Sequence, residues 1–370
     1  MSSGLRLLFV SGVGWGGSAR STLELAGALA RRGNEVAVVL GSSPAHDHGW
    51  FQRGVNAWVK LSRTPLEPAL RYPLRYVGRH LDGPEPLNGA RVYRSPVPEN
   101  AYARLLRAPR PDAVVVSSLS RAAWRWVRHD LVRAGVPSVL YLREAHAIGH
   151  LAVSRAPADL VLANAASYAE RLRDLGYACE VVPSLVVRDE VCVDSTRERV
   201  LYVNPVPEQG LEHVLQLAER RPAVPFVFQE SWPLSDGEWA ALGARASGLG
   251  NVSLRRRAAH PATIYRDARL LVVPPSPGRP RVVLEAHHNG IPVLGADLAP
   301  IREIVGQGGI LVAEDAGPAD WGRALDQLWE PGPAYDSAVE AALANDRRPE
   351  LQPDAIVDRF EHLVAGVARR

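Results

Sequence analysis

Short apolar runs alternate with longer amphipathic stretches along most of this sequence, and this alternation constrains the fold more than any other feature. It begins with an uninterrupted apolar run at 5–10, a glycine-rich loop, a helical stretch and a second apolar run at 35–40. Short runs that are apolar on both faces are typical of strands in a parallel sheet covered by helices on both sides. We therefore predict an α/β fold built from doubly wound, Rossmann-like sheets.

The alternation forms two series, separated by the polar stretch 188–197. A chain of 370 residues is too long for one ordinary core, so we predict two domains. The N-terminal domain spans 1–187 and the C-terminal domain spans 188–352. An apolar stripe in the last segment, 353–370, predicts a helix that packs back on the N-terminal domain. The further predicted strands are 113–116, 138–142, 160–163, 180–182, 200–203, 226–229, 252–254, 270–273, 292–294 and 310–312. The clearest predicted helices between them are 121–134, 167–175, 210–220 and 282–288.

Between Gly41 and Ala108 the alternation fails, and the segment is rich in proline and arginine. These residues interrupt regular hydrogen bonding or favour solvent. We predict loops and irregular helices there. In an enzyme, such a segment is where acceptor specificity would reside.

Composition narrows the class of protein. The chain is 46% hydrophobic and 22% charged, which is typical of folded soluble proteins. It has only two cysteines, so we expect a cytoplasmic protein without a disulfide scaffold. No apolar stretch is long enough for a membrane span, and the basic residues are scattered apart from the run at 255–257, so we expect no integral membrane segment and no nucleic-acid partner. Lys60 is the only lysine, so a phosphate clamp must use arginine, backbone N–H groups or a helix N-terminus.

Ligands of open parallel sheets bind beyond the carboxyl ends of the strands, so the loops after strands are the candidate sites. The first such loop contains Gly16 and Gly17, which let backbone N–H groups approach an anion, and Arg20 follows in the first helical turn. The glycines do not have the G-x-G-x-x-G spacing of a dinucleotide fingerprint. A tight turn that binds no ligand is the alternative.

The second candidate is the Pro/Gly-rich loop at 274–281, which follows a predicted strand and leads into a helix. Its arginines would bind a diphosphate, and the carboxylate about one turn into the helix would accept hydrogen bonds from ribose hydroxyls. The alternative is a helix glutamate that pairs with an arginine. The residues predicted to bind a nucleotide sugar here are Gly278, Arg279, Arg281, Val282 and Glu285.

The third candidate is the loop after the predicted strand 138–142, which contains Arg143, Glu144 and His146. Ionisable groups at a strand end are candidates for contact with sugar hydroxyls or acceptor, and we propose these three as catalytic residues. A structural histidine is the alternative for His146. His287 and His288 are adjacent on one helix and point to different faces, so we interpret them as surface or packing residues and predict no metal site.

The stretch 268–312 carries a family resemblance. Its strand, the Pro-Pro-Ser loop, the helix with Glu285, the Asn-Gly-Ile-Pro-Val turn at 289–293 and the Arg-Glu-Ile-Val segment at 302–305 resemble the signature region of retaining family 4 glycosyltransferases. Segments 16–36, 158–164 and 204–211 are similar to other parts of that family.

The resemblance implies the GT-B fold, in which two Rossmann-like domains face each other across a cleft. It also implies transfer of a sugar from a nucleoside diphosphate sugar to a small-molecule or glycan acceptor, with retention at the anomeric carbon and without a cofactor or metal. We expect the chain to act in a specialised bacterial biosynthetic pathway.

The sequence departs from the family pattern at charged positions. The family has two glutamates separated by seven residues; Glu285 matches the later one, and Pro277 occupies the earlier position. Asn204 and Gln209 stand where the family offers a basic pair toward the diphosphate, and we assign both to the nucleotide-sugar site. A departing diphosphate still needs charge stabilisation, so we expect Arg20, Arg279 and Arg281 to compensate.

Two other functions fit parts of this pattern. A GT-B protein that has lost transfer activity and acts as a binding or regulatory partner would explain the missing charges. A nicotinamide-dependent oxidoreductase would have two Rossmann-like units, but neither contains the spaced glycine fingerprint.

Overall fold

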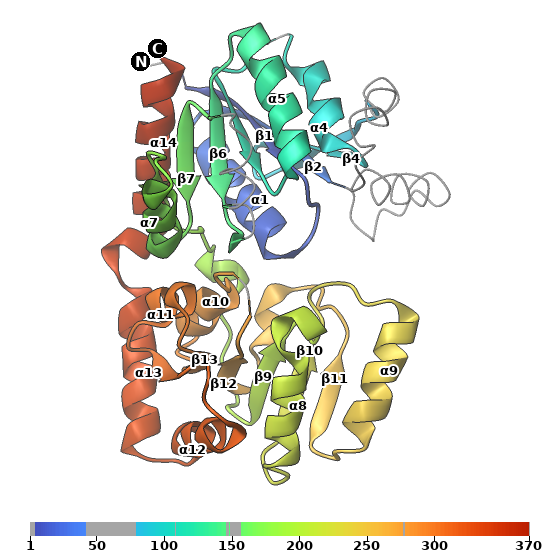
Figure 1. The fold of residues 1–370 in the computed structure, drawn as a ribbon, viewed down its shortest axis with the longest axis vertical. Helices are drawn as coiled ribbons and strands as arrows, with labels where there is room; N and C mark the ends of the chain where they lie inside the picture. Colours follow the sequence, from blue (N-terminus) through green and yellow to red (C-terminus); the bar gives the residue numbers. More distant parts are fainter. Residues whose placement is uncertain are drawn as a thin grey trace. The chain divides into compact units, whose positions relative to one another are not determined.

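The computed structural model describes residues 4–41, 79–107, 109–145, 148, 157–276 and 278–369. These residues form two compact units (Figure 1). The first unit contains the chain up to Asn164, Tyr168–Pro183 and the chain from Ile356 onward, and the second contains Ala165–Ser167 and Ser184–Ala355. Both units are α/β and their sheets are mainly parallel, as the alternation predicts.

The described part of the first unit contains an eight-stranded sheet in the order β3-β4-β2-β1-β5-β6-β7-β8. Every neighbouring pair is parallel except β3 and β4. The central strands are almost completely buried because valine, leucine and phenylalanine occupy both of their faces. The strands are β1 (Arg6–Ser11), β2 (Glu35–Gly41), β3 (Asp82–Leu87), β4 (Ala90–Ser95), β5 (Ala113–Ser117), β6 (Ser138–Leu142), β7 (Leu160–Ala163) and β8 (Glu180–Val181).

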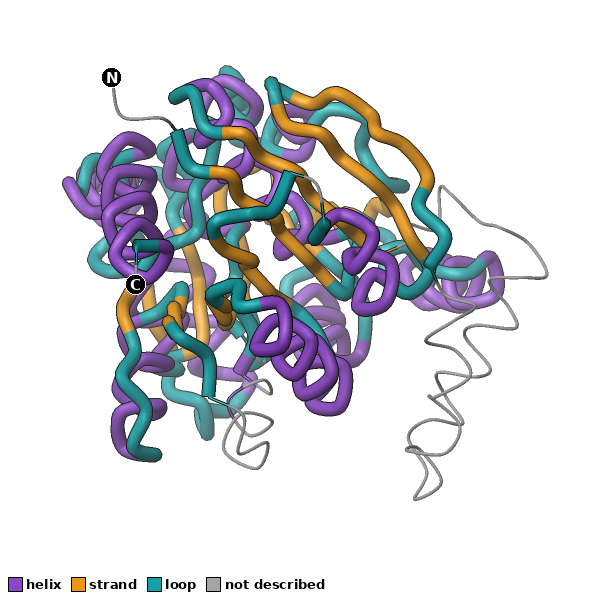
Figure 2. The backbone as a smooth tube through the Cα atoms, turned by 90° about the horizontal axis from the view of Figure 1, so that it is seen from above, coloured by secondary structure: helices purple, strands orange, loops and turns teal. Residues whose placement is uncertain are grey.

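Helices flank these strands (Figure 2). Helix α5 shows how local signals set the bounds: Ser120 caps its N-terminus by accepting a hydrogen bond from the Ala123 N–H, and Gly135 ends it in the left-handed conformation. The helices that begin or lie in this unit are α1 (Gly16–Arg31), α4 (Pro98–Ala101), α5 (Arg121–Ala134), α7 (Ala166–Asp174) and α14 (Pro353–Ala368), with a 3-10 turn at Tyr102–Leu105.

The prediction of loops and irregular helices between Gly41 and Ala108 is wrong for residues 82–87 and 90–95, which form strands. β3 and β4 form a hairpin, and β4 pairs in parallel with β2. Asn88 and Gly89 form the turn with φ values of 49° and 87°, as two-residue hairpin turns require. The prolines of β3 suggested a loop, but they are tolerated because β3 is the edge strand. Residues 42–78 lie outside the described part of the chain.

The second unit has a six-stranded, fully parallel sheet in the order β11-β10-β9-β12-β13-β14. The chain proceeds outward from β9 to β11 on one side and from β12 to β14 on the other. The direction of winding therefore reverses between β9 and β12. The strands are β9 (Arg199–Val203), β10 (Phe226–Gln229), β11 (Val252–Arg255), β12 (Ala268–Val273), β13 (Val293–Ala296) and β14 (Gly309–Val312).

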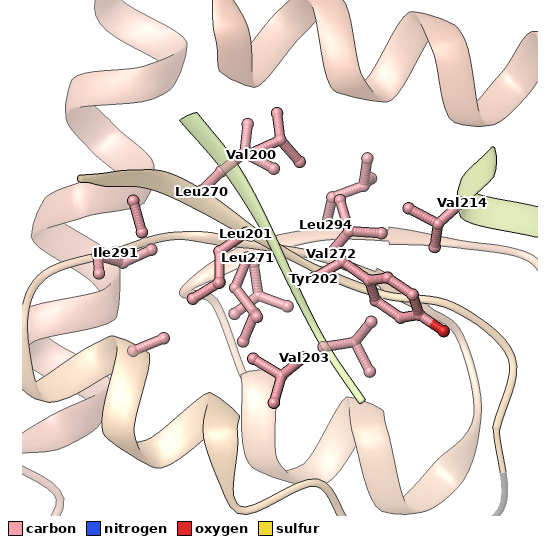
Figure 3. Close-up of a cluster of buried hydrophobic side chains, with 14 of the residues drawn as sticks. Val200, Leu201, Tyr202, Val203, Val214, Leu270, Leu271, Val272, Ile291 and Leu294 are labelled. Atoms are coloured by element: carbon pink, nitrogen blue, oxygen red, sulfur yellow. The ribbon is translucent and has the colours of Figure 1, made fainter. Parts of the chain in front are cut away.

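The core of the second unit lies around these central strands. Figure 3 shows Val200, Leu201, Leu270 and Leu271 of β9 and β12 packed together, and all four are fully buried. The helices are α8 (Leu211–Glu219), α9 (Asp236–Ser247), α10 (Val282–His288), α11 (Ala299–Val305), α12 (Pro318–Trp329) and α13 (Pro333–Asp346). Short 3-10 turns lie at Arg188–Glu190, Pro207–Gln209, Pro261–Ile264 and Pro349–Leu351. Among the described residues of both units, no helix has the length and apolar character needed to span a membrane.

Candidate functional site

The loops after β9 and β12 meet at the winding reversal of the second sheet. Gly210, at the start of α8, has a φ of 77°, and a Cβ added to it would lie 2.7 Å from Cγ of Pro274. Only glycine suits both the backbone conformation and the close approach. The sequence therefore places the Asn204–Gly210 loop directly against the proline loop after β12.

Asn204 and Gln209 both belong to the first of these loops. Asn204 adopts a positive φ of 63°, and its side-chain oxygen accepts a 2.7 Å hydrogen bond from the Trp232 N–H. The carbonyl of Gln209 accepts a 2.9 Å bond from the Tyr202 hydroxyl, which fixes the end of the loop. Asn204 thus ties the loop after β9 to the segment after β10.

Glu285 lies one turn into α10, and its carboxylate is held at both oxygens. The Nε of Arg281 donates to Oε1 across 2.6 Å, and the hydroxyl of Tyr265 donates to Oε2 across 2.6 Å. Glu285 is 3% exposed, so these charge-assisted bonds offset the cost of burying its charge. The arginine-paired glutamate, the alternative left open by the sequence, is present in the structure.

Arg281 has a second partner. Its Nη1 donates to the carbonyl of Leu185 across 2.6 Å, so this guanidinium joins α10 to the segment that enters the second unit. Val282 is the first residue of α10, and Gly278 has a φ of 114° in the loop before it. The loop thus turns sharply at Gly278 before the helix begins.

Arg279 and Arg20 also lie next to carboxylates. The Nε of Arg279 is 3.8 Å from Oε1 of Glu303, and the Arg279 side chain is 2% exposed. Arg20 pairs with Glu24 on the same face of α1 at 2.9 Å. All three arginines expected to neutralise a diphosphate therefore share their charge with a carboxylate of the protein.

The glycine loop of the first unit closes against the loop after β5. The Gly12 N–H donates to the Ser117 carbonyl at 3.1 Å, and a Cβ on Gly12 would lie 2.1 Å from the Ser118 carbonyl oxygen. Gly16 begins α1 with a φ of 75°, and Gly17 is its second residue. Tight packing of the backbone is therefore one reason for the glycines in this loop.

Polar side chains connect three strand ends of the first unit. The hydroxyls of Ser18 and Ser118 are 2.8 Å apart, and Ser118 donates to Oε1 of Glu144 at 2.6 Å. Arg143 is buried beside them and donates to the Ser18 carbonyl at 2.7 Å and to the Thr22 hydroxyl at 2.5 Å. The structure thus brings Arg143 and Glu144 to the start of α1. His146 lies outside the described residues.

The two histidines of α10 have structural partners. His287 is completely buried: its Nε2 is 3.2 Å from the Gly308 carbonyl, and its Nδ1 is 2.8 Å from Nδ2 of Asn345. Burial lowers its pKa from 6.5 to about 4. The Nδ1 of His288 contacts Asp346 at 2.5 Å. The packing interpretation of His287 is confirmed, and no group of three or more potential metal ligands occurs among the described residues.

Tyr265 is the residue of this region that the sequence did not single out. It is fully buried and lies just before β12, twenty residues ahead of the glutamate that it contacts. No local spacing connects the two positions. An aromatic residue three positions ahead of the apolar strand β12 was the only available signal.

Two family models match separate parts of the chain. Residues 15–189 match the model described as Glycosyltransferase Family 4, and residues 211–331 match the model described as Glycosyl transferases group 1. None of the curated proteins matches the chain in sequence.

Several solved structures share the fold. HepE from Anabaena, in complex with UDP, is 14% identical with a TM-score of 0.69, and the match covers 98% of this chain and 100% of HepE. Sucrose-phosphate synthase from Thermosynechococcus elongatus is 13% identical with a TM-score of 0.73, covering 98% and 99%. The pneumococcal O-GlcNAc transferase GtfA, in complex with UDP and GlcNAc, is 11% identical with a TM-score of 0.68, covering 99% and 100%. With a family 4 match over most of its first unit and a group 1 match within its second, this chain is a glycosyltransferase of the GT-B type.

Proposed function

We propose that this glycosyltransferase moves a sugar from a nucleoside diphosphate sugar to a small-molecule or glycan acceptor, with retention at the anomeric carbon. The observation that carries the proposal is the position of Glu285. Glu285 lies on α10, the helix that follows the loop after β12. This loop is next to the winding reversal between β9 and β12, which is where open parallel sheets bind nucleotides. UDP is the first candidate, because HepE and GtfA were both solved with UDP.

In this proposal Glu285 accepts hydrogen bonds from the ribose hydroxyls, and the diphosphate lies between the loops that contain Gln209 and Gly278. Arg279 and Arg281 add positive charge beside the proposed diphosphate although each contacts a carboxylate, because a guanidinium stays protonated at neutral pH. Backbone N–H groups of the two loops complete the contacts with the phosphates.

We propose a single transfer step on one face of the sugar, which retains the anomeric configuration. The acceptor oxygen bonds to the anomeric carbon on the face from which the diphosphate leaves, while the bond from that carbon to the diphosphate oxygen breaks. The proton of the acceptor hydroxyl passes to the departing phosphate oxygen. We assign the acceptor to the strand ends of the first unit, where Arg143 and Glu144 meet the start of α1, together with His146. Gly16, Gly17 and Arg20 remain assigned to the nucleotide sugar.

We also propose that this reaction takes place in the cytoplasm and belongs to a specialised pathway. Cys179 and Cys192 are both free thiols, which suits a reducing cytoplasm, where nucleotide sugars are available. The replacement of family charges at Asn204, Gln209 and Pro277 favours a dedicated donor and acceptor pair, as expected for a specialised bacterial biosynthetic pathway.

Nucleotide binding tests the donor site directly. The thermal unfolding midpoint is measured with UDP, GDP, ADP, TDP and NAD, and we expect one nucleoside diphosphate to raise it. A ligand at about 100 times its dissociation constant adds about 2.7 kcal/mol to stability. Glu285→Gln should lose most of this stabilisation, whereas Glu340→Gln, an exposed glutamate of α13, should keep it.

Turnover measurements test sugar transfer and the retention of anomeric configuration. The sugar donor of the stabilising nucleotide is incubated with the protein, and release of the nucleoside diphosphate is followed with and without candidate acceptors. We expect release above the blank, and product analysis should show the anomeric configuration of the donor. Binding without release under every condition, or an inverted product, would contradict the proposal.

A further inference from the structure

The sheet of the first unit also has a winding reversal, and polar side chains meet beside it. β1 is followed by β2 on one side, whereas β5 to β8 proceed outward on the other, so the direction reverses between β1 and β5. Ser18 lies in the first turn of α1, which follows β1. Ser118 comes directly after β5, and Glu144 comes two residues after β6. Three neighbouring strands therefore contribute to one cluster where open parallel sheets bind ligands.

Ser118 holds an uncommon backbone conformation. Its φ is 51°, in the left-handed region that residues other than glycine rarely occupy. Such a conformation costs free energy and persists only where the surrounding structure fixes it, and residues of this kind gather at ligand sites. Glycine would adopt the same conformation without this cost. A role of the Ser118 hydroxyl would therefore explain why the position is a serine.

The Ser118 hydroxyl links α1 to the loop after β6. It donates to Oε1 of Glu144 across 2.6 Å, and the Ser18 hydroxyl lies 2.8 Å from it. A hydroxyl has one hydrogen, so Ser118 gives its own to the carboxylate and accepts the hydrogen of Ser18. The bonds therefore run in one direction, from Ser18 through Ser118 to Glu144. The terminal torsion of a free glutamate is broad, and this chain of bonds restrains it.

The other carboxylate oxygen of Glu144 lacks a hydrogen-bond donor. Oε2 is shielded from solvent, and none of the described residues donates to it. A buried carboxylate oxygen without a donor costs free energy, and a ligand that donates to it would remove that cost. Glu144 as a whole is partly exposed, so a ligand can approach its side chain. A carboxylate oxygen only accepts hydrogen bonds, and hydroxyl groups are the donors that sugars and polyols offer.

We propose that Ser118, supported by Ser18, is a positioning residue that orients Glu144 so that Oε2 accepts a hydrogen bond from a hydroxyl group of the acceptor. This hydroxyl is a different one from the hydroxyl that attacks the sugar, so the acceptor carries at least two. The inference rests on the proposed function and deepens it. The contact holds a polyhydroxylated acceptor in place for attack, and it favours such an acceptor over water.

The test measures how the donor sugar is divided between an acceptor and water. UDP-glucose, GDP-mannose and ADP-glucose are offered to the full chain as donors, with glucose, glycerol or myo-inositol as acceptors. The ratio of glycoside formed to sugar hydrolysed does not depend on the amount of folded protein. We expect this ratio to fall about tenfold in Ser118→Ala, Ser118→Gly and Glu144→Gln, as loss of one oriented, charge-assisted hydrogen bond to the acceptor should produce.

Three substitutions of Ser118 separate its hydroxyl from its backbone. Ser118→Ala and Ser118→Gly both remove the hydroxyl, but glycine suits the left-handed conformation, so Ser118→Gly should have the higher unfolding temperature of the two. Their ratios should nevertheless be equally low. Ser118→Thr keeps a hydroxyl on a branched side chain that fits a positive φ poorly, so it should be less stable than the parent and yet retain more of the ratio than Ser118→Ala. A merely structural role would make the ratio follow stability.

Ser138→Ala is the matched control. Ser138 is a fully buried serine at the start of β6, and its hydroxyl donates to Oδ2 of Asp159 across 2.9 Å. It lies at the end of β6 opposite to the loop that contains Glu144. The substitution removes the same kind of bond between a serine and a carboxylate, and the parent ratio should be kept.

The outcomes separate this inference from the proposed function. If no donor releases its nucleoside diphosphate, with an acceptor or with water alone, the proposed function fails and the inference fails with it. If the parent forms glycoside while Ser118→Ala and Ser118→Gly keep its ratio, sugar transfer stands and the positioning role is overturned. A parent that hydrolyses a donor but glycosylates none of the acceptors overturns the hydroxyl contact. Glu144→Gln preserves the shape of the side chain, so an unchanged ratio in this variant overturns the inference even if the Ser118 variants do not fold.

Discussion

The ring of Phe360 in α14 stacks on that of Phe9 in β1, with centroids 5.9 Å apart and planes inclined by 19°. Tyr141 of β6 contacts the same ring at 6.4 Å. Helix α14 follows the entire second unit along the chain, yet its apolar stripe is buried in the first. The core of the first unit is therefore incomplete until the last segment of the chain is in place.

Removal of this ring should destabilise the first unit. Phe360 is fully buried, and Phe→Ala in a core typically costs about 3–5 kcal/mol through lost burial and the cavity left behind. We expect Phe360→Ala to lower the urea unfolding midpoint, read by circular dichroism. His362→Ala, on the exposed side of the same helix, should change it by less than about 0.5 kcal/mol. Equal effects of the two variants would show that α14 contributes little to the core.

The buried His287 predicts a specific loss of stability in acid. Its pKa in the folded protein is about 4, against an ordinary value of 6.5, because burial disfavours the charged ring. Between these pH values the unfolded chain binds a proton that the folded protein does not, so stability falls as the pH falls. The loss should amount to about 3 kcal/mol by pH 4 and be absent above pH 7.

The variant His287→Gln isolates this effect. It should be less stable than the parent at neutral pH, since it disturbs the bonds to Asn345 and Gly308. Its disadvantage should shrink steadily from pH 6.5 to 4, because the variant lacks the titrating group. His213, whose pKa is also lowered by burial, contributes to both proteins and cancels in the difference. A difference that stays constant with pH would contradict the assignment.

Much of the fold was predictable because the determining signals are local. The strands at 138–142 and 160–163 and the helices at 121–134 and 282–288 have the predicted bounds. The β3–β4 hairpin was missed because the prolines of its edge strand argue against a strand, and pairing with β2 is a property of the tertiary fold. The Asn88-Gly89 turn was the overlooked signal.

The candidate site was predictable only as a set of loops. Parallel topology brings the loops after β9 and β12 together, and these loops contact each other where Gly210 lies against Pro274. The Arg281–Glu285 spacing of four residues was compatible with a pair, but the sequence did not decide between a pair and a ligand site. Tyr265 could not be assigned, since its contact with Glu285 depends on how β12 and α10 pack.

Gly12 should be intolerant of any side chain. Its backbone conformation is ordinary, but a Cβ would overlap the Ser118 carbonyl, which is backbone and cannot rotate away. We expect Gly12→Ala to cost about 1–3 kcal/mol, as overpacking typically does. Gly237→Ala is the matched control, because nothing lies within 4 Å of its added Cβ and alanine favours the α9 helix. The urea unfolding midpoint should fall for the first variant and stay equal or rise for the second.

The buried pair in α10 allows stability and donor binding to be separated. Glu285→Leu leaves the Arg281 guanidinium buried without its carboxylate, which should destabilise the protein by about 3–5 kcal/mol. The double variant Arg281→Met/Glu285→Leu removes both charges and should regain most of that loss, because apolar side chains of similar length replace the pair. If the double variant is as unstable as Glu285→Leu alone, the two charges are not coupled. If it is stable, it still lacks the carboxylate that we propose binds the ribose, so a nucleotide that stabilises the parent should no longer raise its unfolding temperature. A preserved shift would place the nucleotide elsewhere.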